Sequence, residues 1–193
     1  MRDKRSLSWA ETPSGSSGSA SYKMSDKKVI DVEMAQMAVA GSDTILKTSG
    51  VGSCIVITIY DSISKVGGMA HAMLASAKSK THFGDTVATA REGINEGNLD
   101  AKYADQAVEK LVAELEKLGG KKQNFKAKLI GGARMFKLLS GDKFGIGYQN
   151  TESAKHKLEE LGIFIESEDT GGTIGRSVEF NLENGLVSVN TKM

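Results

Sequence analysis

The sequence has little of what several common protein classes require. It contains one cysteine, one proline and one tryptophan in 193 residues. A single cysteine cannot form a disulfide within the chain, and in the cytoplasm a lone thiol stays reduced. The three histidines are scattered along the chain, and with one cysteine they give no zinc-binding spacing. We therefore expect neither a disulfide framework nor a metal, and no cofactor is predicted.

Charge of one sign and long apolar runs are also missing. The 25 basic and 24 acidic side chains leave a net charge of +1, so no strong field would attract nucleic acid or an anionic membrane. No segment approaches the roughly 20 apolar residues of a membrane span. The basic N-terminus is followed by polar residues rather than by the apolar stretch of a signal peptide. We predict a cytoplasmic protein that is not membrane-inserted and has no nucleic-acid partner.

The length and composition fit one domain preceded by a polar segment. Apolar residues make up 39% of the chain, which is enough for one sizeable core. Residues 1–27 hold the only proline and the only tryptophan, and a Ser- and Gly-rich run in this segment has nothing to bury. We predict that residues 1–27 are a disordered leader or tag, and that residues 28–193 form the domain.

Alternation and helical periodicity predict the main elements of that domain. The β-branched run Ile55–Tyr60 is the clearest strand, and the segment from Lys65 to Leu74 can return as its antiparallel partner. Apolar residues on one face predict a helix over Tyr103–Leu118. Further predictions are strands at Val29–Met37, Ile45–Lys47, Phe125–Ile130 and Ile163–Ile165, a short helix at Ala133–Leu139, a helix capped by Asn150 and ending at Leu161, and a hairpin of Arg176–Leu182 with Leu186–Thr191. The polar stretch Ala75–Ala101, with a weak helix at Thr86–Ile94, is interpreted as a mobile loop near the site.

The first hairpin brings a nucleophile and a base together. A turn centred between Ser62 and Ile63 would place Cys54 directly opposite His71 on one sheet face, where a thiol and an imidazole can share a proton. A bulge at Gly67–Gly68 would instead send the two side chains to opposite faces. With no helix after Cys54 to lower its pKa, His71 would have to form a thiolate–imidazolium pair with it.

The residues before Cys54 can complete such a site. Thr48 precedes the nucleophile by six residues, with glycines between them, and its hydroxyl can orient the imidazole of His71. Backbone N–H groups at Gly52 and Ser53 can bind a developing oxyanion. The structural alternative stays open at this point, because a lone cysteine at the start of an apolar strand is often a small buried side chain, and a histidine between alanines is often part of the core.

Two other motifs fit their usual functions poorly. Asp169-Thr-Gly171 matches the catalytic triplet of aspartic proteases, but polar residues precede it where a buried strand is expected, so we interpret it as a turn near the site. Gly50-Val-Gly52 lacks the third glycine and the following helix of a dinucleotide-binding loop.

Five motifs in order resemble one known family, the CheD chemoreceptor glutamine deamidases. The first includes the candidate site, in Thr48-x-Gly-x-Gly-Ser-Cys54 followed by Lys65-Val-Gly-Gly-Met-Ala-His71-x-Met-Leu74. The others are Lys102-Tyr-Ala-Asp105, Ile130-Gly-Gly-Ala-x-Met-Phe136, Ile146-Gly-x-x-Asn150 and Asp169-Thr-Gly-Gly-x-x-Gly-Arg176-x-Val-x-Phe180. The resemblance extends from about Lys28 to Val189.

The resemblance implies a fold, an activity and partners. It implies an α+β (mixed α/β) layered domain of packed mixed β-sheets flanked by helices, related in its active site to bacterial toxin deamidases. The catalytic set would be Cys54 as nucleophile, His71 as base and Thr48 as the orienting residue. The family hydrolyses side-chain amides of selected glutamines on chemoreceptor cytoplasmic helices, can act on glutamyl methyl esters there, and is bound by a CheC-type phosphatase. Two alternatives remain, namely a non-catalytic adaptor for a receptor or a CheC-type phosphatase, and a cysteine peptidase.

Overall fold

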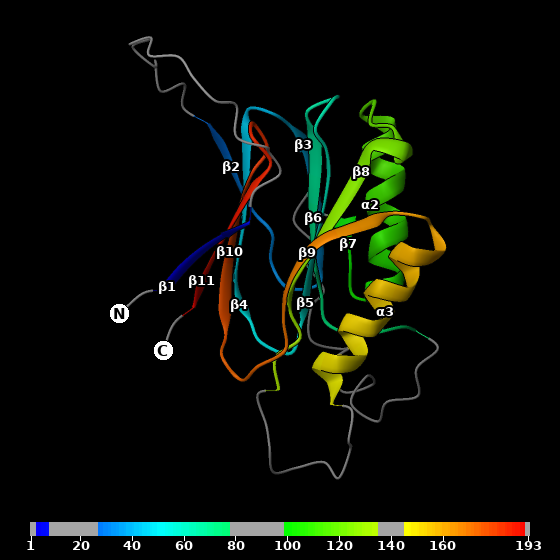
Figure 1. Cartoon of the computed structure of the whole chain (residues 1–193). Helices are drawn as coiled ribbons and strands as arrows, with labels where there is room; N and C mark the ends of the chain where they lie inside the picture. The colour runs from blue at the N-terminus through cyan, green and yellow to red at the C-terminus, as the bar shows by residue number, and fades with distance from the viewer. Residues whose placement is uncertain (1–2, 8–26, 78–98, 135–144, 192–193) are drawn as a thin grey trace.

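The described part of the chain folds into three layers, two β-sheets and a pair of helices. The structure is a computed structural model, and it describes residues 3–7, 27–77, 99–134 and 145–191. Figure 1 shows the first sheet packed against the second, with both helices on the outer face of the second sheet. This arrangement confirms the predicted α+β layered architecture.

The two sheets mix antiparallel and parallel pairs. The first sheet has the order β1 (Asp3–Leu7), β11 (Leu186–Thr191), β10 (Arg176–Asn181), β4 (Thr44–Val51) and β2 (Lys28–Asp31). The second has the order β7 (Leu99–Asp100), β3 (Gln36–Gly41), β6 (Val66–Ala72), β5 (Ile55–Asp61), β8 (Phe125–Gly131) and β9 (Phe164–Thr170). The pairs β2–β4 and β8–β9 are parallel, and the others are antiparallel.

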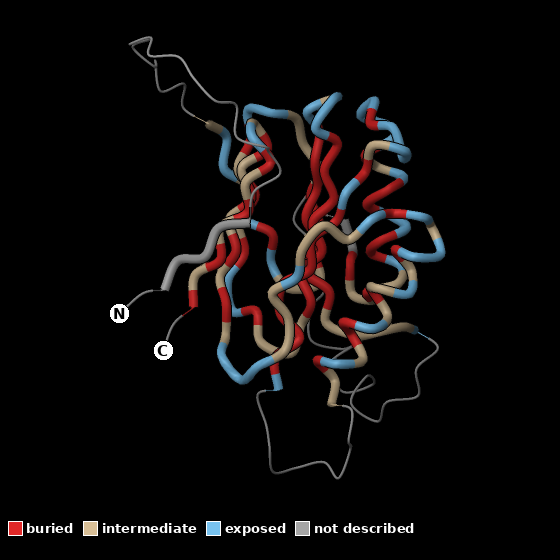
Figure 2. The backbone as a smooth tube through the Cα atoms, in the orientation of Figure 1, coloured by how far each residue is buried: buried red, intermediate tan, exposed pale blue. Residues whose placement is uncertain are grey.

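The burial pattern explains why the second sheet lies in the middle. Every residue of β5 and of β6 is buried, as expected for strands that are covered on both faces. In β10 buried residues alternate with half-buried ones, which indicates one covered face. Figure 2 shows the buried backbone concentrated in the central sheet. One apolar cluster, which includes Val56, Met69 and Phe180, lies between the sheets. A second, which includes Ile57, Leu111 and Leu158, lies between the second sheet and the helices.

Two helices cover the outer face of the second sheet. The helix α2 (Ala104–Lys117) lies within the predicted range, and its apolar face is buried. The helix α3 (Ile146–Glu160) begins four residues before Asn150, after Gly145 in extended conformation, so the prediction that Asn150 caps this helix is wrong. The short 3-10 helix η1 (Lys122–Asn124) leads into β8. Among the described residues, no helix is long and apolar enough to cross a bilayer.

The β5–β6 hairpin forms as predicted but with a different register. Asp61 pairs with Val66, so the loop has four residues, Ser62–Lys65, rather than two. Asp61 Oδ1 accepts hydrogen bonds from the backbone N–H groups of Ile63 and Ser64, at 2.9 and 3.0 Å, and Lys65 has a φ of 55°. An Asp side chain that bonds to the following N–H groups stabilises such a turn in place of a tight two-residue loop. The register continues without a bulge at Gly67–Gly68.

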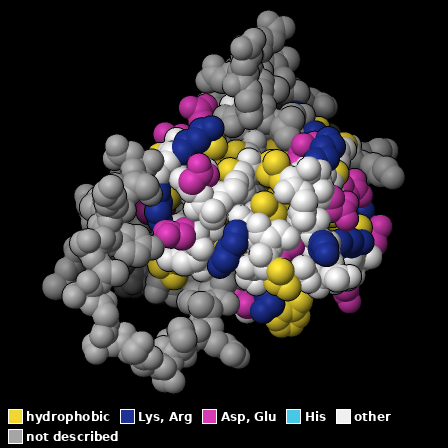
Figure 3. Space-filling view, turned by 90° about the horizontal axis from the view of Figure 1, so that it is seen from above, with side chains coloured by type: hydrophobic (Ala, Val, Ile, Leu, Met, Phe, Trp, Pro, Cys, Tyr) yellow, Lys and Arg dark blue, Asp and Glu magenta, His cyan; other side chains and the backbone are white. Residues whose placement is uncertain are grey.

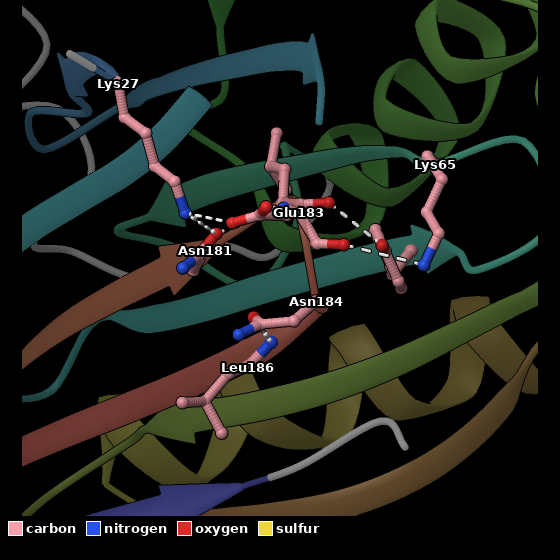
Figure 4. Close-up of polar contacts among 8 residues, drawn as sticks. Lys27, Lys65, Asn181, Glu183, Asn184 and Leu186 are labelled. Carbon is pink, nitrogen blue, oxygen red and sulfur yellow. Dashed lines mark hydrogen bonds and ion pairs between the residues drawn. The ribbon is translucent and has the colours of Figure 1, made fainter. Parts of the chain in front are cut away.

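The predicted β10–β11 hairpin is also present, and its turn is tied to the rest of the molecule. Lys27 forms an ion pair with the Glu183 carboxylate and donates to Asn181 Oδ1 at 3.3 Å. Lys65 Nζ donates to the Glu183 carbonyl at 3.5 Å, which links the β10–β11 turn to the β5–β6 turn across the two sheets (Figure 4). Figure 3 views this end of the molecule from above, where basic and acidic side chains are interspersed.

Parts of the sequence prediction lie outside the described residues. Residues 8–26, 78–98 and 135–144 are among them, so the weak helix at Thr86–Ile94 and most of the short helix at Ala133–Leu139 are not described. The expectation of disorder over residues 1–27 differs from the structure at Asp3–Leu7, whose backbone pairs with β11. The division into a leader and a domain from residue 28 stays a prediction.

Candidate active site

The predicted site residues lie where the chain passes from one sheet to the other. Thr48 is in β4 of the first sheet, while Cys54 comes just before β5 of the second. Gly50, between them, has a φ of 70°, a conformation that glycine adopts without steric cost. His71 is in β6, which pairs with β5. The crossing from β4 to β5 therefore brings the three residues to the same end of the sheet sandwich.

Thr48 and His71 are in direct contact across the two sheets. Thr48 Oγ1 lies 2.8 Å from His71 Nδ1, and the two side chains are 7% and 1% exposed. His71 Nε2 is buried and has no hydrogen-bond partner among the described residues. If Nδ1 carries the proton and donates to Thr48, Nε2 keeps its lone pair, and that tautomer is the one a general base needs. The position of Thr48 beside His71 agrees with the sequence-based expectation.

The pairing of Cys54 with His71 differs from the expectation. His71 faces Val56 across the ladder, because the four-residue turn shifts the register by two. A shift of two preserves the side-chain face, so Cys54 comes two residues before the direct partner of His71. Diagonal neighbours of this kind have Cα atoms about 7–8 Å apart, rather than the closer spacing of a direct pair. In this state Nε2 accepts no hydrogen bond from the thiol, so the predicted shared proton is absent.

Burial keeps both titratable groups neutral. Desolvation raises the pKa of the Cys54 thiol from 9.0 to about 11, although its own backbone N–H opposes the shift. Desolvation lowers the pKa of His71 from 6.5 to about 4. At neutral pH the structure therefore holds a thiol and a neutral imidazole, and the thiolate–imidazolium pair expected from the sequence is not its resting state.

Three successive carbonyl groups fix the backbone around Cys54. The Gly52 carbonyl accepts from the Ala133 N–H at 2.8 Å, and the Cys54 carbonyl accepts from the Gly132 N–H at 2.7 Å. Between them, the Ser53 carbonyl accepts from Asn150 Nδ2 at 2.9 Å. Within the described part of the chain, no carbonyl accepts a hydrogen bond from the N–H groups of Gly52 or Ser53. An anion-binding role for these two N–H groups is therefore compatible with the geometry, as in an oxyanion hole.

Two glycines at the end of β8 allow the chain there to approach the backbone around Cys54 closely. A Cβ built on Gly131 would lie 2.4 Å from the Cys54 carbonyl oxygen, and one on Gly132 would lie 2.3 Å from Thr151 Oγ1. Both glycines also have positive φ values. Only glycine fits at these two positions, since real Cβ atoms do not make contacts this short.

Sequence reasoning missed the role of two further groups near the site. Asn150, interpreted as a helix cap, instead bonds to the Cys54 segment from within α3. The Arg176 guanidinium bonds to Asp169 Oδ1 and to the Gly171 carbonyl, both at 3.0 Å, and the Gly171 N–H bonds to the Gly131 carbonyl. The only signal in the sequence was that these residues recur in the motifs of the resemblance.

The same contacts bear on the aspartic-protease alternative. A catalytic aspartate of that type shares a proton with a second carboxylate. Here the Asp169 carboxylate is paired with Arg176, at 3.0 Å, and both side chains are almost fully buried. Asp169 and Thr170 are the last residues of β9, so the turn predicted at Asp169–Gly171 begins only after Thr170, and the ion pair joins the end of β9 to the start of β10.

A reduced thiol, a neutral imidazole with a free nitrogen and a hydroxyl that orients it are the parts of a cysteine-dependent hydrolase. The comparisons with known proteins define the family. The family described as CheD chemotactic sensory transduction matches residues 88–191, more than half of the chain. The chain belongs to the CheD family.

Curated relatives match over most of the chain. The chemoreceptor glutamine deamidase CheD of Halalkalibacterium halodurans is 40% identical over 84% of this chain and 93% of its own length. The probable CheD of Geobacillus kaustophilus is 40% identical over 87% of this chain and 95% of its own. The CheD of Thermotoga maritima is 39% identical over 84% of this chain and 90% of its own.

A solved structure is more distantly similar. A Neisseria meningitidis protein of the DUF152 family superposes with a TM-score of 0.44 at 10% identity, over 86% of this chain and 75% of that one. A similarity of this size says nothing about activity.

Proposed function

We propose that this protein is a protein-glutamine glutaminase that converts selected glutamines on the cytoplasmic helices of chemoreceptors to glutamate, with release of ammonia. Relatives 39–40% identical over more than four fifths of the chain are named chemoreceptor glutamine deamidases. The observation that carries the proposal is the buried hydrogen bond between Thr48 and His71 at the end of the sandwich where Cys54 lies. It leaves Nε2 of the imidazole without a partner in the part of the chain that the structure describes.

The first half of the reaction forms a thioester. Cys54 Sγ attacks the side-chain amide carbon of the substrate glutamine as its proton passes to His71 Nε2. The N–H groups of Gly52 and Ser53 donate to the oxyanion that develops on the amide oxygen. His71 then gives the proton to the amide nitrogen, the C–N bond breaks, and ammonia leaves.

The second half of the reaction hydrolyses the thioester and regenerates the free enzyme. Water attacks the thioester carbon while His71 Nε2 accepts its proton, and the C–S bond then breaks to release glutamate as His71 returns that proton to Cys54 Sγ. Thr48 holds Nδ1 throughout, so that Nε2 faces the reacting atoms in both halves. Proton transfer to His71 accompanies the attack rather than preceding it, because both groups are neutral in the resting state.

The partners follow from the proposed substrate. The substrate glutamines lie on receptor helices inside the cell, so the protein would act in the cytoplasm in chemotactic adaptation. A CheC-type phosphatase is the second proposed partner, on the strength of the family resemblance. No cofactor takes part in the proposed reaction.

Peptide mass spectrometry of a chemoreceptor cytoplasmic fragment tests the proposal. The parent protein and a Cys54→Ala variant are incubated separately with the fragment, and each glutamine is followed for conversion to glutamate. Conversion by the parent alone supports the reaction and the nucleophile together. Cleavage of the fragment backbone would instead support a cysteine peptidase, and no conversion by either protein would refute the deamidase proposal.

One observation favours a second candidate, the non-catalytic adaptor. A thiol with a pKa near 11 is unreactive at rest, as a cysteine with only a packing role would be. In that case the Cys54→Ala variant would bind the receptor fragment or the phosphatase as tightly as the parent, and neither protein would change the glutamines.

A further inference from the structure

Asn150 connects the nucleophile segment with the base strand. Its side chain projects from α3, is fully buried, and donates through Nδ2 to the Ser53 carbonyl at 2.9 Å and to the Met73 carbonyl at 2.8 Å. Ser53 immediately precedes Cys54, and Met73 follows His71 by two residues. One amide group therefore holds both catalytic segments.

The two hydrogen bonds from Asn150 connect the two segments just beyond the point where the β5–β6 ladder ends. The last β5–β6 pair is Ile55 with Ala72, and one step further the register would place Cys54 opposite Met73. The Met73 N–H instead donates to the Lys102 carbonyl, so it turns away from the β5 side. Beyond the last ladder pair, the side chain of Asn150 joins the two segments.

The Asn150 side chain donates two hydrogen bonds through its nitrogen, but its oxygen accepts none from the described residues. Asn150 Oδ1 is buried and has no hydrogen-bond partner among the described residues. The two carbonyl partners also fix which end of the amide is the nitrogen, since an oxygen there would face two other oxygens. A side chain that leaves a buried acceptor unpaired destabilises the fold, so packing alone is a poor explanation for it.

The helix that carries Asn150 is a rigid support. A Cβ on Gly147 would lie 2.5 Å from the Gly132 carbonyl oxygen, so the first turn of α3 packs backbone to backbone against the strand end after β8. Thr151 Oγ1 donates to the Gly147 carbonyl within the same turn. The backbone that carries Asn150 is therefore closely packed and has little room to move.

We propose that Asn150 is a positioning residue that sets the separation between Cys54 and His71. It touches neither the substrate nor the reacting atoms, and acts through the backbone of Ser53 and Met73. The inference rests on the proposed function for its catalytic consequence, but its structural part stands without that function.

The chain offers a matched control on the same helix. Ser153 Oγ donates to the Ala75 carbonyl at 2.6 Å, which is a second bond from α3 to the segment after His71. Ser153→Ala removes one such bond without releasing Ser53. Asn150→Asp is nearly the same size as the parent side chain, but its carboxylate cannot donate and would face two carbonyl oxygens.

The first measurement is the alkylation rate of Cys54 by iodoacetamide at pH 8, which needs no enzymatic activity. Cys54 is the only cysteine in the chain, so each modification reports on one site. We expect Asn150→Asp to be alkylated at least about 10-fold faster than the parent, because a released segment exposes the thiol to solvent. Ser153→Ala should stay within about twofold of the parent, since the Ser53 bond remains.

The second measurement is steady-state deamidation of the receptor fragment. Asn150→Asp should lower kcat by about 100-fold with KM within about twofold of the parent, because misplacement by about 1 Å costs that much. Its kcat relative to the parent should rise as the pH falls from 8 to 5, because a protonated carboxyl group regains one donor. A purely structural role would lower the melting temperature without producing this pH dependence.

The two measurements separate the possible failures. If the parent does not deamidate the fragment, the proposed function fails, and the alkylation rates alone decide the positioning role. Alkylation and kcat within about twofold of the Ser153→Ala values would overturn the inference. Should Asn150→Asp not fold, Asn150→Ser, which is too short to reach both carbonyls, takes its place with the same expected alkylation rate, kcat and KM but with no recovery of kcat at low pH.

Discussion

The two ends of the sheet sandwich treat their buried polar groups in opposite ways. At the hairpin end, the fully buried Asp61 accepts from Ile63 and Ser64 through Oδ1, and from the Lys121 N–H and Asn124 through Oδ2. At the site end, His71 Nε2 and Asn150 Oδ1 are buried and have no hydrogen-bond partner within the described ranges of the chain.

The difference separates groups that stabilise the fold from groups available for chemistry. Burial alone would raise the pKa of Asp61, but its four hydrogen bonds outweigh that effect and lower it. Nothing comparable offsets burial at His71, whose pKa falls to about 4. A saturated buried group contributes to folding, whereas an unsaturated one retains a lone pair for a substrate or a proton.

Replacement of His71 should produce the largest functional effect. We expect His71→Gln to lower kcat/KM for the receptor fragment by roughly 1,000-fold, because a general base typically contributes 10²–10⁴-fold. The free energy of unfolding in urea should change by less than about 1.5 kcal/mol, since the imidazole makes one hydrogen bond. Activity within tenfold of the parent would show that the unpartnered nitrogen is not the base.

Replacement of Asp61 should show the reverse pattern. Asp61→Ala leaves three backbone N–H groups without their acceptor, and we expect it to lower the free energy of unfolding by about 3 kcal/mol. The specific activity of the folded fraction should match the parent. The stability that Asp61 contributes should be complete above its ordinary pKa of 3.8 and be lost as the pH falls through its lower folded pKa. A loss of specific activity alongside the loss of stability would contradict the proposed difference between the two ends.

The reactivity of the lone thiol sharpens the description of the site end. A shift of the Cys54 pKa from 9.0 to about 11 predicts that iodoacetamide reacts at pH 7 roughly 100-fold more slowly than with a free thiol. The rate should keep rising beyond pH 9 rather than level off there. Because the folded pKa is the higher one, the stabilising contribution is complete below pH 9 and is lost as the pH rises toward 11. A rate that levels off near neutral pH would indicate a thiolate–imidazolium pair instead.

Thr48 should have a smaller effect than His71, because it acts through the imidazole. We expect Thr48→Val to lower kcat by about 10-fold, since it keeps the shape of the side chain but loses the 2.8 Å contact to Nδ1. Thr48→Ser retains the hydroxyl and should stay within about threefold of the parent. Steady-state rates of the two variants, measured together, distinguish loss of the hydroxyl from loss of packing, and equal losses would argue against an orienting role.

Exposed ion pairs at the hairpin end should matter least. The Lys27–Glu183 pair is partly exposed on both sides, at 24% and 40% of the side-chain surface. We expect Lys27→Ala to change the free energy of unfolding by less than about 1 kcal/mol and to leave deamidation unchanged. A loss above about 2 kcal/mol in a urea titration would show that this end depends on more than Asp61 and the apolar core.

Local patterns in the sequence predicted the elements but not the contacts between distant ones. The β-branched run of β5, the apolar face of α2 and the Glu183-Asn-Gly185 turn each contain their own signal, and all three elements formed. The predicted register of the β5–β6 hairpin was wrong by two residues, because the Asp61 side chain supports a four-residue turn that the alternation of apolar residues does not reveal. A shift by an even number preserved the predicted face.

The candidate site was predictable only in part for the same reason. Thr48 and Cys54 are six residues apart, so local spacing was sufficient to connect them. Asn150 lies 97 residues from Ser53 and 77 from Met73, and no periodicity predicts a contact over that separation. The direction in which the pKa values of Cys54 and His71 shift could also not be predicted from the sequence. These shifts depend on burial by the second layer rather than on neighbours in the chain.

Trapping the covalent intermediate tests the central claim most directly. The parent protein and the receptor fragment are mixed, quenched in acid, digested and searched by tandem mass spectrometry for a thioester between Cys54 and the side chain of a receptor glutamine. We predict an adduct on Cys54 that hydroxylamine removes and that is absent from Cys54→Ala, in parallel with the loss of conversion. Conversion of the glutamines at the parent rate by Cys54→Ala, with no adduct on the parent, would contradict the account.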